Sequence, residues 1–304
     1  MAAPPLQGWP GAPGAERDRL ILEAVRAGRY EHEWCPLVLS DGGGQTLTVE
    51  VSCDALRIDG VRVSVSARLQ QQVADLLGAV LLTPKLSDLI WQKTTGRIPP
   101  SPQPFTSSTR GMIEHSVRVD ALAAGKSRPL ADPGKDWVLV RSIFTSQARA
   151  KHKAANYGWH VASGQLAAVT PGLRVIQSVG TTHVNFHDDY SQVARFARVS
   201  ARAGERPVDL RDVYTGKEGS LVDLVSHEGP LPDSRQPNGA PPLVEEPPPL
   251  KPPVLASASA PSLAVPVGLG AAAGAVGWVA AGAQGGFWGA LGGLVVGWIA
   301  SRRS

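Results

Sequence analysis

The sequence predicts an α+β fold, with a mixed, mostly antiparallel sheet and short helices, followed by a Pro-rich linker and a C-terminal transmembrane helical hairpin. Three observations support this prediction. Short runs of alternating apolar residues are typical of strands, and apolar runs with capping residues are typical of helices. In addition, no charged side chain lies between Lys251 and Arg302. The 304 residues leave room for about two small domains and tails.

The N-terminal part is expected to hold one helix and several strands. Residues 1–15 are rich in Pro and Gly, so we expect disorder there, and they contain no apolar run typical of a secretory signal. A helix is expected from Glu16 to Gly28. Strands are expected over 36–40, 45–52 and 55–66. Within the last of these, Asp59-Gly60 between alternating apolar residues predicts a hairpin.

Two helices with clear start signals follow. Ser66 is the expected N-cap of a helix that ends near Gly78. Thr83 is the expected N-cap of the next helix, with Pro84 in its first turn, and this helix ends before Gly96.

A Pro/Ser-rich segment over 97–108 is either a domain boundary or a long loop over the core. Beyond it we expect a buried strand over 136–144, two further apolar runs over 172–180 and 193–201, and a helical segment over 220–229. We predict that 16–229 form one soluble α+β domain, and the alternative is a split near 96–110.

The C-terminal part differs sharply in composition. Residues 230–261 are dominated by proline and contain no aromatic residue, which predicts an extended linker. The apolar run over 262–300 is longer than one membrane-spanning helix requires and about long enough for two, with Gln284 at the turn between them. The alternative is a segment buried in an assembly such as a phage or injection particle. Glycines spaced four apart on the second helix favour packing against a second copy, as a homo-oligomer; they are Gly285, Gly289, Gly293 and Gly297.

Basic residues orient this hairpin. Lys251 precedes it, and Arg302 and Arg303 follow it within the short basic end 301–304. The positive-inside tendency therefore places both ends, and the N-terminal domain, on the cytoplasmic side of the membrane. Cys35 and Cys53 could form one disulfide or remain two buried thiols, and a cytosolic chain favours thiols. The net charge of +4 is scattered and no nucleic-acid motif is present, so nucleic acid is not an expected partner.

Polar and aromatic residues concentrate between Lys151 and Ser191. His160, His183 and Asp189 are the residue types that hold a catalytic Zn²⁺ and leave a position for water. Lys153 or Tyr157 would then stabilise the oxyanion. A second hypothesis makes Ser191 or Tyr190 a nucleophile beside His183 or His187. The third is that these residues pack and hydrogen-bond within a core, or bind a ligand without catalysis, with residues 151–153 as a solvated turn.

Two strings in this region, NYGWH and TTHVNFHDDYSQ, resemble a widespread family of bacterial proteins without an assigned activity. The family pattern also has an LPT-type segment, where this chain reads LLTP. The resemblance covers roughly Leu20 to Leu231. It implies that the following residues matter: Tyr157, Trp159, His160, His183, Asp189, Tyr190 and Ser191. The Pro-rich linker and the glycine-rich hairpin depart from the family pattern.

Two functions follow from these patterns. The first is a membrane-tethered hydrolase, metal-assisted, acting on cell-wall peptide or glycan in a phage-like lysis or injection context. The second is a non-enzymatic ligand- or partner-binding domain carried by a holin-like or pore-forming hairpin in the lipid bilayer. Convergence of His160, His183 and Asp189 on one point would favour the hydrolase.

Overall fold

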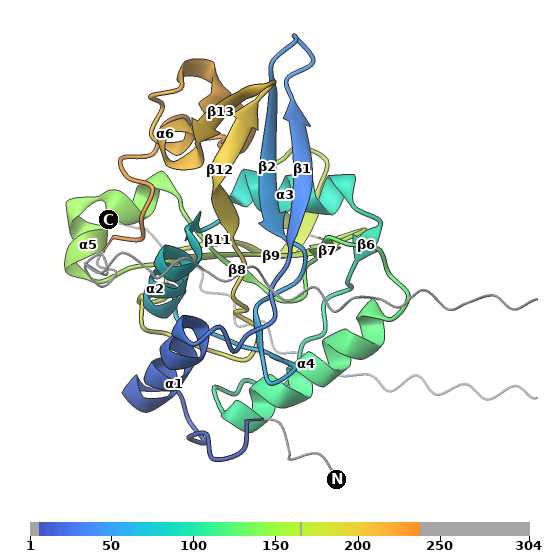
Figure 1. The fold of residues 1–304 in the computed structure, drawn as a ribbon, viewed down its shortest axis with the longest axis vertical. Coiled ribbons are helices and arrows are strands. Elements are labelled where there is room, and N and C mark those ends of the chain that lie inside the picture. The colour runs from blue at the N-terminus through green and yellow to red at the C-terminus, as the bar shows by residue number, and fades with distance from the viewer. Residues whose placement is uncertain (1–5, 165, 238–304) are drawn as a thin grey trace, which may run out of the picture. The chain divides into compact units, whose positions relative to one another are not determined.

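The computed structural model describes residues 6–164 and 166–237, and their architecture is α+β with mostly antiparallel sheets (Figure 1). The larger sheet has five antiparallel strands. Four of them lie in the order β1 (Trp34–Ser40), β2 (Thr46–Ser52), β12 (Ala197–Ala203) and β13 (Arg206–Asp209), and the fifth, β5 (Ala79–Val80), pairs with β12. The second sheet has four, in the order β10 (Leu166–Ala167), β11 (Arg174–Gly180), β9 (Ala155–Val161) and β8 (Asp136–Val138). Two small pairs complete the strands: β3 (Arg57–Ile58) with β4 (Val61–Arg62), and β6 (Gly96–Arg97) with β7 (Leu130–Ala131).

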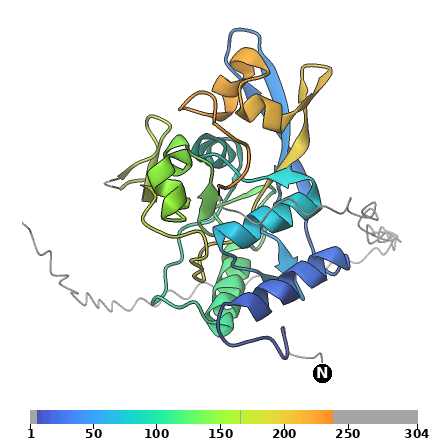
Figure 2. The same ribbon diagram turned by 90° about the vertical axis from the view of Figure 1, so that its left-hand side faces the viewer.

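Short helices surround these sheets. They are α1 (Ala15–Arg26), α2 (Ala67–Leu77), α3 (Pro84–Lys93), α4 (Thr109–Ala123), α5 (Ser146–Ala150), α6 (Leu210–Tyr214) and α7 (Val222–Val225), with 3₁₀ turns at Arg141–Phe144 and Gly219–Leu221. The β1–β2 hairpin lies at one end of the domain, and α1 lies at the other end (Figures 1 and 2).

The predicted local signals are present. The Ser66 hydroxyl accepts a hydrogen bond from the amide of Leu69, and Gly78 ends α2 in the left-handed conformation. Thr83 caps α3 in the same way, with Pro84 in its first turn. Asp59 and Gly60 both have positive φ, which is the backbone that a tight two-residue hairpin requires.

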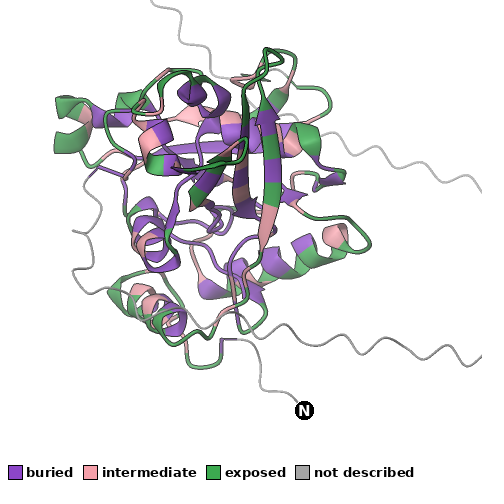
Figure 3. Ribbon diagram, turned by 45° about the horizontal axis from the view of Figure 1, so that its top comes forward, coloured by how far each residue is buried: buried purple, intermediate pink, exposed green. Residues whose placement is uncertain are grey.

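One main core extends over both halves of the described chain. It includes residues on either side of the 97–108 segment, from Leu6 to Leu231. Strands β1 and β2 alternate between buried and solvent-facing positions as they cross it (Figure 3). The packed region also extends past the predicted limits of 16 and 229, because Leu6, Leu231 and Gln236 are buried.

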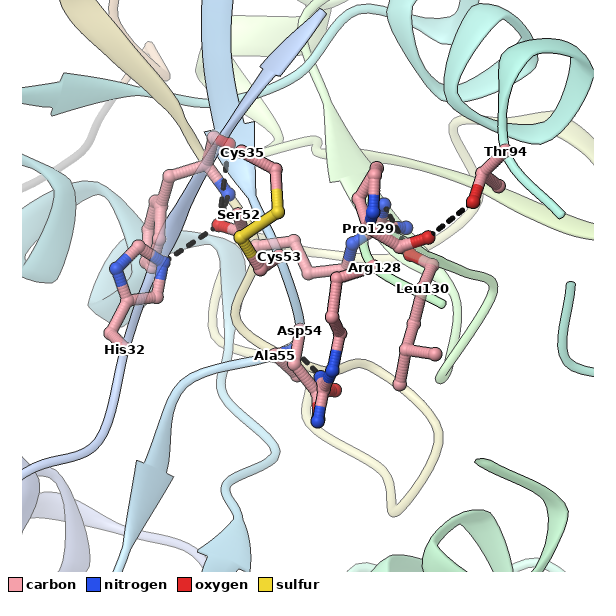
Figure 4. Close-up of a disulfide and its surroundings, with 12 residues drawn as sticks. His32, Cys35, Ser52, Cys53, Asp54, Ala55, Thr94, Arg128, Pro129 and Leu130 are labelled. Carbon is pink, nitrogen blue, oxygen red and sulfur yellow. Dashed lines mark hydrogen bonds and ion pairs between the residues drawn. A yellow bond between two sulfur atoms is a disulfide. The ribbon is translucent and has the colours of Figure 1, made fainter. Parts of the chain in front are cut away.

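The two cysteines form a disulfide, so the preference for thiols was wrong. Cys35 lies on β1 and Cys53 follows β2, and the antiparallel register brings their Cα atoms to 5.1 Å (Figure 4). The bond lies beside Asp54 and Arg128, whose side chains form an ion pair of 2.7 Å.

Replacing both cysteines by serine should lower the free energy of unfolding by about 3 kcal/mol, because the bond closes a short loop in the unfolded chain. The urea midpoint of the full chain, measured by pulse proteolysis, checks this. Wild-type protein treated with a reductant is the matched control and should lose the same amount. An unchanged midpoint in both samples would contradict a stabilising role.

No helix within 6–164 and 166–237 has the length and apolar character needed to cross a bilayer. The predicted hairpin over 262–300 and its glycines lie outside the described residues.

Candidate functional site

The YGWH string lies on β9, where the backbone departs from a regular strand. Gly158 has φ +124° and Trp159 has φ +57°, a conformation that few non-glycine residues adopt. In a regular strand, residues three apart point to opposite faces. Here the rings of Tyr157 and His160 are instead 5.9 Å apart. The ring of Trp159 faces a different group, with Lys135 Nζ 5.5 Å from its centroid and Tyr190 nearby. The string therefore serves two separate clusters.

The first cluster, which we name the His160 centre, consists of Asp88, Asp132, Tyr157 and His160. His160 Nε2 lies 2.8 Å from Asp88 Oδ1, and Nδ1 lies 2.9 Å from Asp132 Oδ2. The Tyr157 hydroxyl donates to the same Asp88 oxygen at 2.6 Å. Since both ring nitrogens face carboxylate acceptors, the imidazole carries two protons and a positive charge.

Electrostatics agree with this protonation state. Burial alone would lower the pKa of His160, but the charges and hydrogen bonds of Asp132 and Asp88 outweigh burial and raise the pKa to about 9. Burial and the neighbouring Asp88 carboxylate raise the pKa of Tyr157. The centre is therefore an ion cluster with an uncharged phenol at neutral pH.

The His160 centre is closed to solvent. Each of its four residues is at most 2% exposed. The Trp91 ring of α3 stacks on His160 at 5.2 Å, and the amides of Val169 and Thr170 donate to the Tyr157 hydroxyl and to Asp88. These contacts hold β9, α3 and the 168–170 loop together.

A further cluster lies at the surface, and we name it the histidine patch: Phe105, His183, Phe186 and His187. The rings of His183 and His187 stack with centroids 4.1 Å apart, and Phe105 stacks on His187 at 6.3 Å. Phe186 lies in a turn closed by the bond from the His187 amide to the Val184 carbonyl, at 3.0 Å. Phe105 is 72% exposed and Phe186 is 65% exposed.

Asp189 lies behind the patch and is held by several donors. Its Oδ1 accepts bonds from the amide and the hydroxyl of Ser191, and its Oδ2 is 3.7 Å from both Lys135 Nζ and His187 Nε2. That separation is too long for a hydrogen bond, so the attraction is electrostatic. Burial opposes ionisation of Asp189, but these neighbours lower its pKa to about 2. The pKa of His183 is lowered by burial and then by the charges of His187 and Lys135, so His183 is neutral at pH 7.

The structure does not bring the three predicted zinc ligands together. His160 belongs to the buried centre and has no free ring nitrogen, whereas His183 belongs to the histidine patch and Asp189 lies behind that patch. Among the described residues there is no group of three or more His, Cys, Asp or Glu side chains that could hold a metal ion.

The four predicted catalytic residues are divided in the same way. Tyr157 is in the His160 centre. Lys153 Nζ donates to the Thr182 carbonyl at 2.5 Å, and the Tyr190 hydroxyl bonds to the backbone of Gln103. Ser191 is 1% exposed and its hydroxyl donates to Asp189. Each of these side chains therefore fixes a loop, and they do not meet at one reactive point.

Sequence reasoning missed Asp88, Asp132 and Lys135. Asp88 is the one acid among the buried residues of α3, which also include Leu86, Ser87 and Ile90, and an acid at such a position needs a buried partner. That signal was available for Asp88. Asp132 and Lys135 lie in a turn-rich stretch whose pattern carries no comparable signal.

Comparison of the chain with protein-family models, with curated proteins and with solved structures gives no match.

Proposed function

We propose that residues 6–237 are a non-enzymatic binding domain of a membrane-tethered protein, and that the domain binds through the histidine patch. The observation that carries the proposal is the exposure of Phe105, whose ring stacks on His187 of the His183–His187 pair, and of Phe186, the residue that precedes His187. Exposed aromatic side chains close together are typical of surfaces that bind something, because they offer a large apolar area at low cost in side-chain entropy.

The distribution of polar groups supports binding over metal-assisted hydrolysis. A catalytic metal needs three converging ligands and an open position. Both ring nitrogens of His160 instead face carboxylates of the His160 centre, which is separate from the patch. The tether would be the Pro-rich segment and the apolar run over 262–300, which are proposals from sequence alone.

A photo-crosslinking amino acid at position 105 or 186 of the full chain, expressed in cells, tests the binding surface. We expect both positions to yield the same adduct, with less adduct from position 186 when Phe105 is changed to Ser. Val38 on β1 is the matched control, since it is 54% exposed on a different element. Adducts that form equally from Val38, or from none of the three positions, would contradict the proposal.

A hydrolase remains a second candidate because the patch includes titratable groups. His183 is a neutral imidazole beside His187, Asp189 and Lys135, which is a suitable composition for a general base. Turnover of labelled cell-wall fragments by the full chain that is lost in both His183→Ala and Asp189→Asn would establish it and replace the binding proposal.

We expect the purified full chain, prepared without a His-tag, to hold well below one zinc ion per chain. The reason is that the three predicted ligands lie in two clusters. Plasma mass spectrometry measures the metal content, with His183→Ala and Asp189→Asn as comparisons. Stoichiometric zinc that falls in both variants would mean that the patch rearranges into a metal site.

A further inference from the structure

We propose that the histidine patch docks on the surface of an anionic lipid bilayer. This inference rests on the proposed function and names the ligand of the same surface. It follows from the charge around the patch, from its shape, and from where the chain leaves the domain.

Basic residues adjoin the Phe186 turn of the patch. The amide of Arg68 donates to the Asn185 carbonyl, and the carbonyl of His152 accepts from the Asn185 amide, so both residues adjoin the Phe186 turn. The side chains of Arg68, Lys151 and His152 are exposed. The backbone of Lys153 forms a β-bridge with Val184, which lies in the same turn. Lysine and arginine near a bilayer surface are attracted by anionic headgroups.

The carboxylates of the same segment point inwards. Asp188 is 6% exposed and pairs with buried Arg17, and Asp189 is 6% exposed and is held by Ser191 and Lys135. Asp18 on α1, which interacts electrostatically with Arg68, is half-buried. The outward-facing charge beside the Phe186 turn is therefore mainly positive. Apolar rings among basic side chains are typical of proteins that rest in the headgroup region.

The shape of the patch suits a soft surface better than a small ligand. Phe186 projects from the tip of a turn. Two hollows of the domain, one around Arg198 and Val199 and one around Thr83 and His227, include no residue of the patch. Small-molecule sites are concave, whereas a projecting aromatic ring can insert among lipid headgroups.

The chain also leaves the domain beside this surface. Gln236, next to the last described residue, donates from Nε2 to the Lys153 carbonyl at 3.2 Å. Its amide donates to Gln71 on α2, and Arg235 pairs with Asp75 of the same helix, so the exit point is fixed. The sequence beyond it contains the charge-free run over 262–300. The described chain thus ends at residue 237 on the side of the domain that carries the patch.

Fluorine NMR of the full chain in lipid nanodiscs tests this docking. The chain has five phenylalanines, so 4-fluorophenylalanine gives at most five resonances, which Phe105→Leu and Phe186→Leu assign. In discs with anionic lipid, a headgroup-level nitroxide lipid should remove most of the signal from positions 105 and 186, and a soluble gadolinium chelate should have little effect. Buried Phe144 and Phe196 are internal controls. The lipid effect should weaken in zwitterionic discs, at high salt, and in the double variant Arg68→Glu/Lys151→Glu.

Each other outcome overturns the inference in a distinguishable way. If the soluble chelate reaches both positions and the lipid label reaches neither, the patch does not dock on lipid, and the crosslinking test then decides whether it binds anything else. If neither probe reaches them, another occupant, such as a second copy or residues 238–261, covers the patch. That result would overturn lipid docking while supporting the proposed binding surface.

Discussion

Replacing His160 by alanine is expected to lower the free energy of unfolding by about 3–5 kcal/mol, a large part of the stability of an ordinary domain. The substitution leaves Asp88 and Asp132 as buried carboxylates without their shared cation. It also removes the ring on which Trp91 stacks. The urea midpoint of the full chain, by pulse proteolysis, measures the loss.

His227→Ala is the matched control for this experiment. His227 is less buried, and its ring makes one hydrogen bond, of 3.1 Å, to the Thr170 hydroxyl. We expect a loss below about 1 kcal/mol for it. Similar midpoints for the two alanine variants would show that the His160 centre contributes little to stability.

The same centre predicts how stability depends on pH. The pKa of His160 is raised from 6.5 to about 9 in the folded state, so its stabilisation is complete below about pH 6.5 and is lost as the pH rises to about 9. The expected loss across this window is on the order of 3 kcal/mol. His160→Gln should flatten this part of the pH profile. A wild-type profile that is flat from pH 6.5 to 9 would contradict a charged imidazole.

Replacing Arg17 by alanine is expected to lower the free energy of unfolding by a similar amount, about 3–5 kcal/mol. Arg17 is fully buried on α1, where it pairs with Asp188 and donates to the Ser107 carbonyl at 3.0 Å. Even with this partner, burial raises the pKa of Asp188 to about 6, so loss of the guanidinium leaves a strongly disfavoured buried carboxylate. Urea unfolding measures the loss, and hydrogen exchange should also rise in the 104–107 loop.

Arg19→Ala on the same helix is the matched control. Its guanidinium pairs with Glu16 and Glu23, and its side chain is 51% exposed, so we expect the urea midpoint to change little. The double variant Arg17→Ala/Asp188→Ala should recover part of the stability. No recovery would mean that the cost comes from lost packing of the arginine and not from the unpaired carboxylate.

Local signals in the sequence predicted much of the fold. The caps of α2 and α3 and the Asp59-Gly60 hairpin depend on residues within a few positions of each other, so they can be read directly. Helix α4 was not predicted. The strand expected over 136–144 ends at Val138, after which the chain forms a 3₁₀ turn. The apolar residues of that run would be buried both in a strand and in a 3₁₀ turn, so hydrophobicity alone does not distinguish the two structures.

The candidate site was predicted less well, for two physical reasons. The partners of His160 are 72 and 28 residues away in sequence, and only the packing of α3 and β7 against β9 brings them close. In addition, the positive φ values of Gly158 and Trp159 break the alternation by which faces of a strand are assigned. Residues 151–191 do contribute the histidines of both clusters, as their concentration indicated, but one cluster lies in the interior and the other at the surface.

The disulfide has a consequence for topology. Disulfides persist in oxidising compartments and are rare in the cytosol, whereas the basic residues flanking the apolar run predict a cytoplasmic domain. The oxidation state of Cys35 and Cys53 in intact cells therefore records the compartment that the domain occupies. Rapid acid quenching and alkylation would find two thiols if the domain stays in the cytosol, and a blocked pair if it has crossed the membrane or left the cell. These are the only cysteines of the chain, so the readout needs no added label.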